Sequence, residues 1–340
     1  MDLEKRAQKL IRWLKDRKLS GCLVQDPVNL LYYTGINIST GLLYIGVDKK
    51  VLFVDFRYYD RCKKEVPFEV MSTKSFKETL KNFSLPAKVG VDSHVVLLKD
   101  FELYKEFCEP ISYPGFLTLI RMIKEPKEIK LIKESCELTK AGFKYIQRHF
   151  KEGVTEAQLA EMLQIYLLKQ GATKMAFDPI VAFGKNAANP HYTPGNVKLK
   201  KNDVILIDCG SVWKNYYSDM TRTFIKGKVS KKMETLIELC KYAQKHAVDA
   251  CKPGLSIKEL NEIVQMIFKK EGVQDLFIHG LGHGVGLEVH EYPSLAQKEM
   301  VLEKGMIITI EPGLYVSGLG GVRIEDTLLI TSNGNENLTS

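Results

Sequence analysis

Apolar residues in the first part of the chain recur at helical and strand-like spacings. Over residues 3–14 they follow the period of an amphipathic helix. Short apolar runs typical of strands follow at residues 21–24, 42–47, 51–56, 68–71 and 89–91. Asp48-Lys49-Lys50 joins the second run to the third and favours a hairpin connection. The pattern therefore predicts an α/β unit.

Prolines and a glycine interrupt this pattern between residues 110 and 125, and a long helical pattern follows. It begins near Pro126, because proline suits the first turn of a helix, and it runs to about His149. A length of 340 residues also corresponds to about two domains. We therefore predict one domain over residues 1–120 and a second over residues 121–340.

The second region contains an internal duplication. Residues 151–171 align with residues 252–272 at an offset of 101, and 7 of the 21 positions are identical. Thr155 and Ser256 occupy the positions of helix N-caps, each ahead of an amphipathic pattern that stops at a glycine. Chance similarity between two amphipathic helices explains this match less well once the later segments also repeat in the same order. We infer two related halves about a pseudo-twofold axis.

Each half of the duplication carries two acidic residues in equivalent places. A strand-like run ends in Asp208 in the first half and in Glu311 in the second, at an offset of 103. Asp219 and Glu325 follow at an offset of 106. Carboxylates gathered without a partner are costly, so we expect a cation to hold them together. Four negative charges nearly balance two divalent ions, which favours metal over arginine.

Three of the seven histidines lie in one glycine-rich segment, residues 279–290. They are His279, His283 and His290. His283 supplies the nitrogen ligand that, added to the four acids, makes the donor set of a two-metal hydrolytic site. Oxygen ligands suit hard cations such as manganese.

The composition is that of a globular protein, with 45% hydrophobic residues, 26% charged residues and a net charge of +8. No apolar run reaches the ~20 residues of a membrane-spanning helix, and residues 1–18 lack the apolar stretch of a signal peptide, so we expect no membrane partner. Lysines are interleaved with glutamates, which argues against nucleic-acid binding. Seven scattered cysteines without a CxxC pair favour reduced thiols and a cytoplasmic location.

Five blocks of residues resemble the pita-bread metallopeptidases, the family of methionine aminopeptidase, aminopeptidase P and prolidase. The blocks are residues 177–184 with 189–191, 208–224, 282–286 with 289–291, 310–313, and 320–327. Residues 1–120 resemble the creatinase-type N-terminal domain of the proline-specific members. The resemblance implies an α/β (α+β) fold in which a creatinase-type domain precedes a pseudo-twofold pita-bread catalytic domain.

The resemblance also implies roles for individual residues. Asp219 and Glu325 would bind both metal ions, whereas Asp208 would bind one ion and His283 with Glu311 the other. The implied catalytic residues are Glu311, His290 and His191. The implied substrate-binding residues are His191, His279, His290 and Arg323. Glu311 would carry a proton to the leaving proline nitrogen, and His290 would stabilise the developing oxyanion.

The expected activity is hydrolysis of the Xaa-Pro bond at the N-terminus of peptides, as by an Xaa-Pro aminopeptidase. The alternative is an Xaa-Pro dipeptidase (prolidase), because the catalytic blocks do not separate the two. A non-catalytic pita-bread binding module is a weaker alternative, since all five ligand positions are filled. The resemblance further implies two divalent ions per subunit, manganese first with cobalt or zinc as alternatives, and a homodimer acting on proline-containing peptides.

Overall fold

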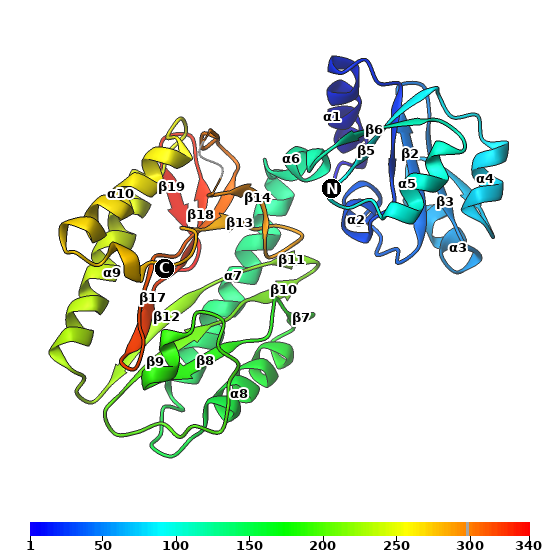
Figure 1. The fold of residues 1–340 in the computed structure, drawn as a ribbon. Helices are drawn as coiled ribbons and strands as arrows, with labels where there is room; N and C mark the ends of the chain where they lie inside the picture. Colours follow the sequence, from blue (N-terminus) through cyan, green and yellow to red (C-terminus); the bar gives the residue numbers. More distant parts are fainter. Residues whose placement is uncertain (297–298) are drawn as a thin grey trace. The chain divides into compact units, whose positions relative to one another are not determined.

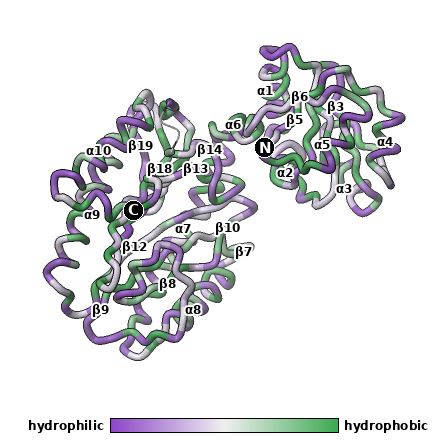
Figure 2. The backbone as a smooth tube through the Cα atoms, viewed as in Figure 1, coloured by the Kyte–Doolittle hydropathy of each residue, from purple (hydrophilic) through white to green (hydrophobic). Residues whose placement is uncertain are grey.

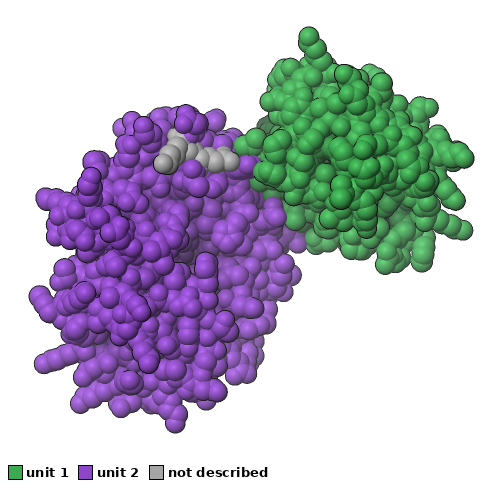
Figure 3. Space-filling model, in the orientation of Figure 1, with its two compact units in different colours: residues 1–121 green, residues 122–340 purple. Residues whose placement is uncertain are grey.

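The computed structural model describes residues 1–296 and 299–340. The chain divides into two compact units, residues 1–121 and residues 122–340, coloured separately in Figure 3. No helix within the described residues has both the length and the apolar character needed to cross a membrane.

The first unit is built around a six-stranded mixed sheet. The strands are β1 (Gly21–Val24), β2 (Gly41–Gly46), β3 (Lys50–Val54), β4 (Glu69–Ser72), β5 (Lys88–Asp92) and β6 (Glu109–Tyr113). They are arranged in the order β4-β3-β2-β1-β5-β6. β1 and β5 are parallel, whereas β1, β2 and β3 form an antiparallel meander. Every residue of β2 is buried, because helices cover both faces of the sheet.

Six helices surround this sheet. They are α1 (Leu3–Asp16), α2 (Pro27–Thr34), α3 (Phe56–Glu65), α4 (Phe76–Asn82), α5 (Leu98–Lys105) and α6 (Phe116–Arg121). Aromatic side chains of α4 and α5 pack onto one face of the sheet, around Tyr44 and Phe53. α1 contacts β1 and β2, and it buries the apolar stripe that its sequence pattern predicts.

Two local predictions for the first unit were wrong. The run over residues 51–56 does not continue as a strand, because the Asp55 side chain accepts a hydrogen bond from the backbone N–H of Arg57 and caps α3. The stretch near residue 110, where the sequence pattern is interrupted, contains β6 and α6, which the pattern did not predict. Pro110 is tolerated in β6 because this strand lies at the edge of the sheet.

The second unit contains two copies of one helix-and-sheet arrangement. The first copy comprises α7 (Pro126–Gln147), α8 (Glu156–Lys169), β7 (Lys174–Met175), β8 (Ile180–Phe183), η1 (Gly184–Ala188), β9 (Asp203–Asp208), β10 (Ser211–Trp213), β11 (Tyr216–Tyr217) and β12 (Thr221–Lys226). β9 lies between β8 and β12 and is antiparallel to both. α7 and α8 pack on these strands through an apolar core that includes Phe143, Leu163 and Ile205.

The second copy repeats the plan with α9 and α10 in place of α7 and α8. Its elements are α9 (Lys231–Ala250), α10 (Ile257–Lys270), η2 (Gln274–Leu276), β13 (His283–Gly284), β14 (Glu291–Ser294), β15 (Ile307–Ile310), β16 (Gly313–Val316), β17 (Gly320–Arg323), β18 (Asp326–Ile330) and β19 (Asn335–Asn337). Figure 1 shows α9 and α10 on one side of the strands of this unit and α7 and α8 on the other. The hydropathy colouring of Figure 2 shows apolar segments along these strands.

The predicted duplication is visible in matching backbone geometry. Gly153 and Gly254 both adopt positive φ, at 89° and 87°, a conformation that glycine adopts without steric cost. The N–H of Gly153 donates to the carbonyl of Leu199 at 2.9 Å, and the N–H of Gly254 donates to that of Leu302 at 2.8 Å. Both following helices start with a capping box, at Thr155, the residue before α8, and at Ser256, the residue before α10. The two copies therefore share a fold.

Candidate metal centre

One cavity of about 500 Å³ in the second unit is lined by every site residue that the sequence predicted. These residues are His191, Asp208, Asp219, His279, His283, His290, Glu311, Arg323 and Glu325. They come from both copies of the duplicated fold, so the cavity forms only where the two halves meet.

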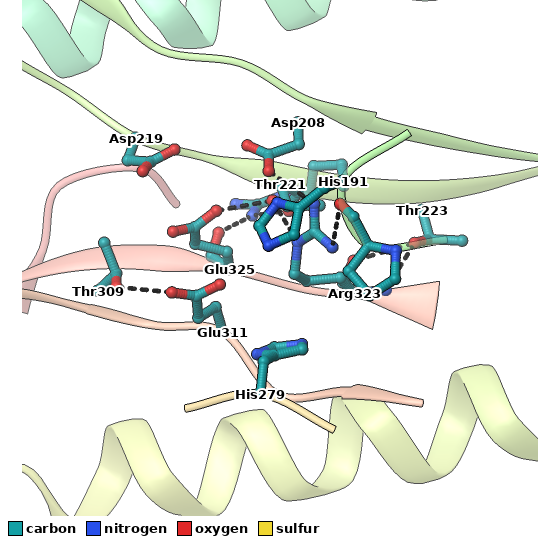
Figure 4. Close-up of polar contacts among 12 residues, drawn as sticks. His191, Asp208, Asp219, Thr221, Thr223, His279, Thr309, Glu311, Arg323 and Glu325 are labelled. Atoms are coloured by element: carbon teal, nitrogen blue, oxygen red, sulfur yellow. Dashed lines mark hydrogen bonds and ion pairs between the residues drawn. The ribbon is translucent and has the colours of Figure 1, made fainter. Parts of the chain in front are cut away.

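The four acids lie where strands of the two copies begin or end. Asp208 is the last residue of β9, and Glu311 follows the end of β15 directly. Asp219 lies two residues before β12, and Glu325 lies between β17 and β18. Their carboxylates are directed toward a common space in Figure 4. This is the arrangement expected from the duplicated strand-then-acid pattern.

The two copies are hydrogen-bonded to each other at this point. The backbone N–H of Glu325 donates to the carbonyl of Thr221 at 3.1 Å, and the hydroxyl of Thr221 donates to Oε2 of Glu325 at 2.7 Å. The hydroxyl of Thr327 donates to the carbonyl of Asp219 at 2.8 Å. These contacts fix the positions of Asp219 and Glu325 relative to each other.

The protein alone leaves the acids of this cavity short of positive charge. Oδ1 of Asp208 and Oδ1 of Asp219 are buried and have no hydrogen-bond partner among the described residues. Burial, with the Asp208 and Glu311 charges, raises the pKa of Asp219 well above its usual value. Burial and the nearby Asp219 do the same to the pKa of Glu325, and burial raises the pKa of Glu311 to about 7. Such a cluster is stabilised by a bound cation.

His283 is oriented as a metal-ligating imidazole would be. Its Nδ1 lies 3.1 Å from the carbonyl of Gly284. Because a carbonyl only accepts, Nδ1 carries the proton and Nε2 presents a lone pair to the cavity. Nε2 lies 3.7 Å from Oδ2 of Asp219 and 3.4 Å from Oε1 of Glu311. Burial and the neighbouring His290 lower the pKa of His283 to about 3, so at neutral pH the imidazole is neutral.

The donor set fits a divalent metal ion. Asp219, His283 and Glu325 each offer a ligand atom, and these atoms lie within 4.8 Å of one another. Carboxylate oxygens with one imidazole nitrogen match the preference of ions such as manganese. Thr309 donates to Oε1 of Glu311 at 3.3 Å. A threonine hydroxyl thus orients this carboxylate, as the Thr221 hydroxyl orients that of Glu325.

Arg323 lines the cavity, but its guanidinium is already engaged by the protein. Nη2 donates to Oδ2 of Asp208 at 2.6 Å, and Nη1 donates to the hydroxyl of Tyr315 at 2.7 Å. Nδ1 of His279 donates to the Gly280 carbonyl at 2.8 Å, which leaves its Nε2 to accept from the Tyr315 hydroxyl at 2.9 Å. Tyr315 therefore links the two residues that the sequence predicted as substrate-binding.

His290 and His191 face the same cavity from segments outside regular structure. The His290 ring lies 4.1 Å from the His283 ring, centroid to centroid. His191 follows Pro190, whose carbonyl accepts from Nη1 of Arg323 at 3.4 Å. Several apolar side chains also line the cavity, namely Phe177, Pro179, Ile180 and Pro194. The cavity lining therefore combines polar and apolar side chains.

Sequence reasoning missed the side chains that hold the site residues in place. Tyr315 lies in β16, four residues after Glu311, where a tyrosine is indistinguishable from a core residue. Thr221 and Thr309 are hydroxyl residues within strands, a position they often occupy for packing alone. A signal for Thr221 was its place two residues after Asp219, but spacing alone does not show the direction of a side chain.

Comparison with known proteins identifies two domains in this chain. A model of the Creatinase/Prolidase N-terminal domain matches residues 6–123, and a model of Metallopeptidase family M24 matches residues 130–332. The Xaa-Pro dipeptidase of Pyrococcus furiosus is 35% identical over 99% of this chain and 98% of its own length. These matches confirm the predicted family and its hydrolase activity.

Solved structures agree with this fold along nearly the whole chain. The prolidase from Pyrococcus furiosus matches with a TM-score of 0.91 and 35% identity, over 97% of this chain and 99% of that one. The Xaa-Pro dipeptidase from Bacillus anthracis matches with a TM-score of 0.95 and 30% identity, over 100% and 98%. The X-Pro aminopeptidase from Thermotoga maritima matches with a TM-score of 0.88 and 28% identity, over 98% and 97%.

The predicted fold class is thereby confirmed, and a divalent metal ion is implied by the family together with the donor set of the cavity. The chain belongs to metallopeptidase family M24, and it carries the creatinase/prolidase type of N-terminal domain.

Proposed function

We propose that this protein is an Xaa-Pro dipeptidase that hydrolyses the bond before a C-terminal proline. The observation that carries the proposal is the meeting of four acids, His283 and an apolar wall in one cavity. The second domain, which we predicted over residues 121–340, would perform the chemistry, and the domain of residues 1–120 would be the creatinase-type domain. The division into units supports these limits.

Two divalent ions, manganese first, would be held by the acids and His283. The ligands would be Asp208, Asp219, His283, Glu311 and Glu325. When bound, such ions lower the pKa of water and stabilise negative charge on the attacked carbonyl oxygen. Cobalt and zinc are alternatives, because affinity and availability need not agree.

The chain's own residues would handle protons and developing charge. Glu311, held by Thr309, would accept a proton near the attacked carbonyl and donate it to the proline nitrogen as that nitrogen leaves. His290 and His191 face the same cavity and would donate hydrogen bonds to the oxyanion and the substrate. Without the hydrogen bond from Thr309, the Glu311 carboxylate would not be held in one orientation for this transfer.

Recognition of proline would use the apolar side chains that line the cavity. An Xaa-Pro bond is a tertiary amide without an N–H, so a strand-like hydrogen-bonding site would not serve it. The wall near Phe177 and Pro179 offers apolar contact to a pyrrolidine ring. His279 and Arg323, joined through Tyr315, lie on the cavity wall and would bind the carboxyl side of the substrate.

The preference for a dipeptidase reverses the expectation from sequence. The catalytic blocks favoured neither activity strongly, and we expected an Xaa-Pro aminopeptidase. Relatives from two Pyrococcus species, each 35% identical to this chain, are named Xaa-Pro dipeptidase, and they support the alternative. The similarity to the Thermotoga maritima X-Pro aminopeptidase keeps that activity as the second candidate.

Cleavage of a matched peptide series tests the proposal. The manganese-loaded protein is given Ala-Pro, Ala-Pro-Pro and Ala-Ala, and the released amino acids are quantified. A dipeptidase cleaves Ala-Pro faster than Ala-Pro-Pro and leaves Ala-Ala intact. Faster cleavage of the tripeptide establishes the aminopeptidase instead, and no cleavage of either proline peptide refutes both. The homodimer and the cytoplasmic location stay predictions.

A further inference from the structure

We propose that Glu156 is a positioning residue that fixes the segment carrying His191 in the catalytic cavity. The proposal rests on the function above, because it assigns Glu156 a part in the same reaction. Glu156 is the first residue of α8 and its side chain is fully buried, yet it does not line the cavity. It therefore acts through other residues.

The Glu156 carboxylate accepts four hydrogen bonds from one stretch of chain. Oε1 accepts from the backbone N–H of Phe183 at 2.7 Å and from the side-chain amide of Asn186 at 2.9 Å. Oε2 accepts from the hydroxyl of Tyr192 at 2.9 Å and from the backbone N–H of Gly195 at 3.2 Å. Hydrogen bonds to a carboxylate are stronger than those between neutral groups. One side chain thus clamps both ends of residues 183–195.

His191 lies inside this clamped stretch, where no regular structure holds it. Residues 189–196 form neither helix nor strand. Its other hydrogen bonds include that of the His191 N–H to Oδ1 of Asn189 at 3.1 Å, that of Arg323 to the Pro190 carbonyl at 3.4 Å, and that of the Ala157 N–H to the Gly195 carbonyl at 3.0 Å. Glu156 adds four hydrogen bonds to these from a fully buried side chain.

The duplicated half shows that the fold does not require a carboxylate at this position. The residue equivalent to Glu156, at the offset of 101, is Ile257, which is also the first residue of its helix and is fully buried. The corresponding strand connection contains His290, and a different acid anchors it. Glu291 accepts from the backbone N–H of Leu287 at 3.1 Å and pairs with Lys124 at 2.7 Å. Each half thus anchors its catalytic histidine with its own buried acid.

The variant Glu156→Ile copies the other half and tests this role. It places isoleucine at the first position of α8, as the second half has Ile257 at the first position of α10. We expect a loss of roughly ten- to hundredfold in kcat/KM for Ala-Pro, since small displacements of a positioned group have effects of this size. Manganese stoichiometry stays at the wild-type value. Glu156→Gln, of equal size, covers the case in which the isoleucine variant does not fold.

A double-mutant cycle with His191→Ala decides whether Glu156 acts through His191. In the His191→Ala background, Glu156→Ile changes kcat/KM by less than about threefold, because the positioned group is already gone. Gln158→Ala is the matched control, since the exposed Gln158 side chain accepts from the Thr155 N–H in the same helix turn. It leaves kcat/KM within about twofold of wild type. Additive losses in the cycle, or wild-type kinetics in His191→Ala, overturn the proposal.

Backbone hydrogen exchange separates failure of this inference from failure of the proposed function. The N–H groups of Phe183 and Gly195 donate directly to Glu156, so they exchange faster in Glu156→Ile and at the wild-type rate in Gln158→Ala. Unchanged exchange in Glu156→Ile overturns the anchoring role whether or not the enzyme is active. Absence of Xaa-Pro cleavage by the wild-type protein refutes the function alone.

Discussion

The guanidinium of Arg323 and the carboxylate of Asp208 form a buried ion pair, with 2.6 Å between Nη2 and Oδ2. Their side chains are only 4% and 13% exposed. Burial alone would lower the pKa of Arg323, but the Asp208 charge raises it well above the usual value, so the guanidinium stays charged. Arg323 therefore positions an expected metal ligand in addition to any contact with substrate.

Replacement of Arg323 by methionine is expected to destabilise the metal-free protein by about 3–5 kcal/mol, because it leaves the Asp208 charge buried without its partner. Urea unfolding of chelator-treated protein measures this change. Lys77→Met is the control, since the Lys77–Glu106 pair is exposed and such pairs contribute about 0–1 kcal/mol. Equal stability of the two variants contradicts the structural role of Arg323.

Asp219→Asn is expected to raise the melting temperature of the metal-free protein and to remove its response to manganese. Burial and the Asp208 and Glu311 charges raise the pKa of Asp219 and so disfavour its ionised form, and the amide removes this repulsion. At a metal concentration of about 100 Kd, the wild type gains about 2.7 kcal/mol. Thermal scans with and without manganese test both effects. A normal manganese response in Asp219→Asn excludes Asp219 as a ligand.

Manganese affinity is expected to fall as the pH falls through about 7, the value to which burial raises the pKa of Glu311. Burial and neighbouring acids raise the pKa of Asp219 and of Glu325, so the metal-free centre binds protons at pH values where an ordinary carboxyl is ionised. A metal ion must displace these protons, and lower pH opposes it. Titration calorimetry in two buffers of different ionisation enthalpy measures the protons released. Affinity independent of pH contradicts this assignment.

Gly282→Ala is expected to displace His283 and to reduce manganese stoichiometry. A Cβ at Gly282 would lie 2.1 Å from the carbonyl oxygen of Thr309, so the backbone next to His283 must shift. Gly280→Ala is the matched control, because a Cβ there meets no atom within 4 Å. Metal analysis of both purified variants makes the comparison. Full metal content in Gly282→Ala shows that His283 is not held as rigidly as the structure indicates.

Tyr315→Phe is expected to lower kcat/KM for Ala-Pro about tenfold with manganese stoichiometry unchanged. The change removes the hydroxyl between Nη1 of Arg323 and Nε2 of His279 and leaves buried polar groups unpaired, at a cost of about 1–3 kcal/mol. Tyr104→Phe is a control in the first unit, where the hydroxyl bonds only Gln25 among the interactions of the described residues. Wild-type kinetics in Tyr315→Phe remove Tyr315 from substrate binding.

Much of this site was predictable because the internal duplication is visible in the sequence. The repeated strand-then-acid pattern is enough to single out Asp208 and Glu311 in the sequence, and the fold brings both into one cavity. The capped helices at Thr155 and Ser256 were likewise predictable, since N-capping depends on local residues. Roles assigned to single residues stay predictions until the variants are measured.

The supporting residues were not predictable, because their roles depend on contacts between distant segments. Glu156 reads as an ordinary acid in the first turn of a helix, and only the folded chain shows its hydrogen bonds to residues 183–195. Pro110 reads as a strand breaker, although an edge position tolerates it. The choice between dipeptidase and aminopeptidase depends on what limits substrate length, which the catalytic blocks do not encode.

The union of both halves in one polypeptide has a consequence for how this centre diversified. In a site formed by two identical subunits related by rotation, every side chain would occur twice. The imidazole of His283 and the carboxylate of Glu156 would then each appear in both subunits. In a single chain the two halves can differ. Glu156 and Ile257, which occupy equivalent positions in α8 and α10, illustrate this difference. Asymmetry of this kind lets the second half carry the imidazole of His283 while the first half carries the Glu156 carboxylate that holds residues 183–195.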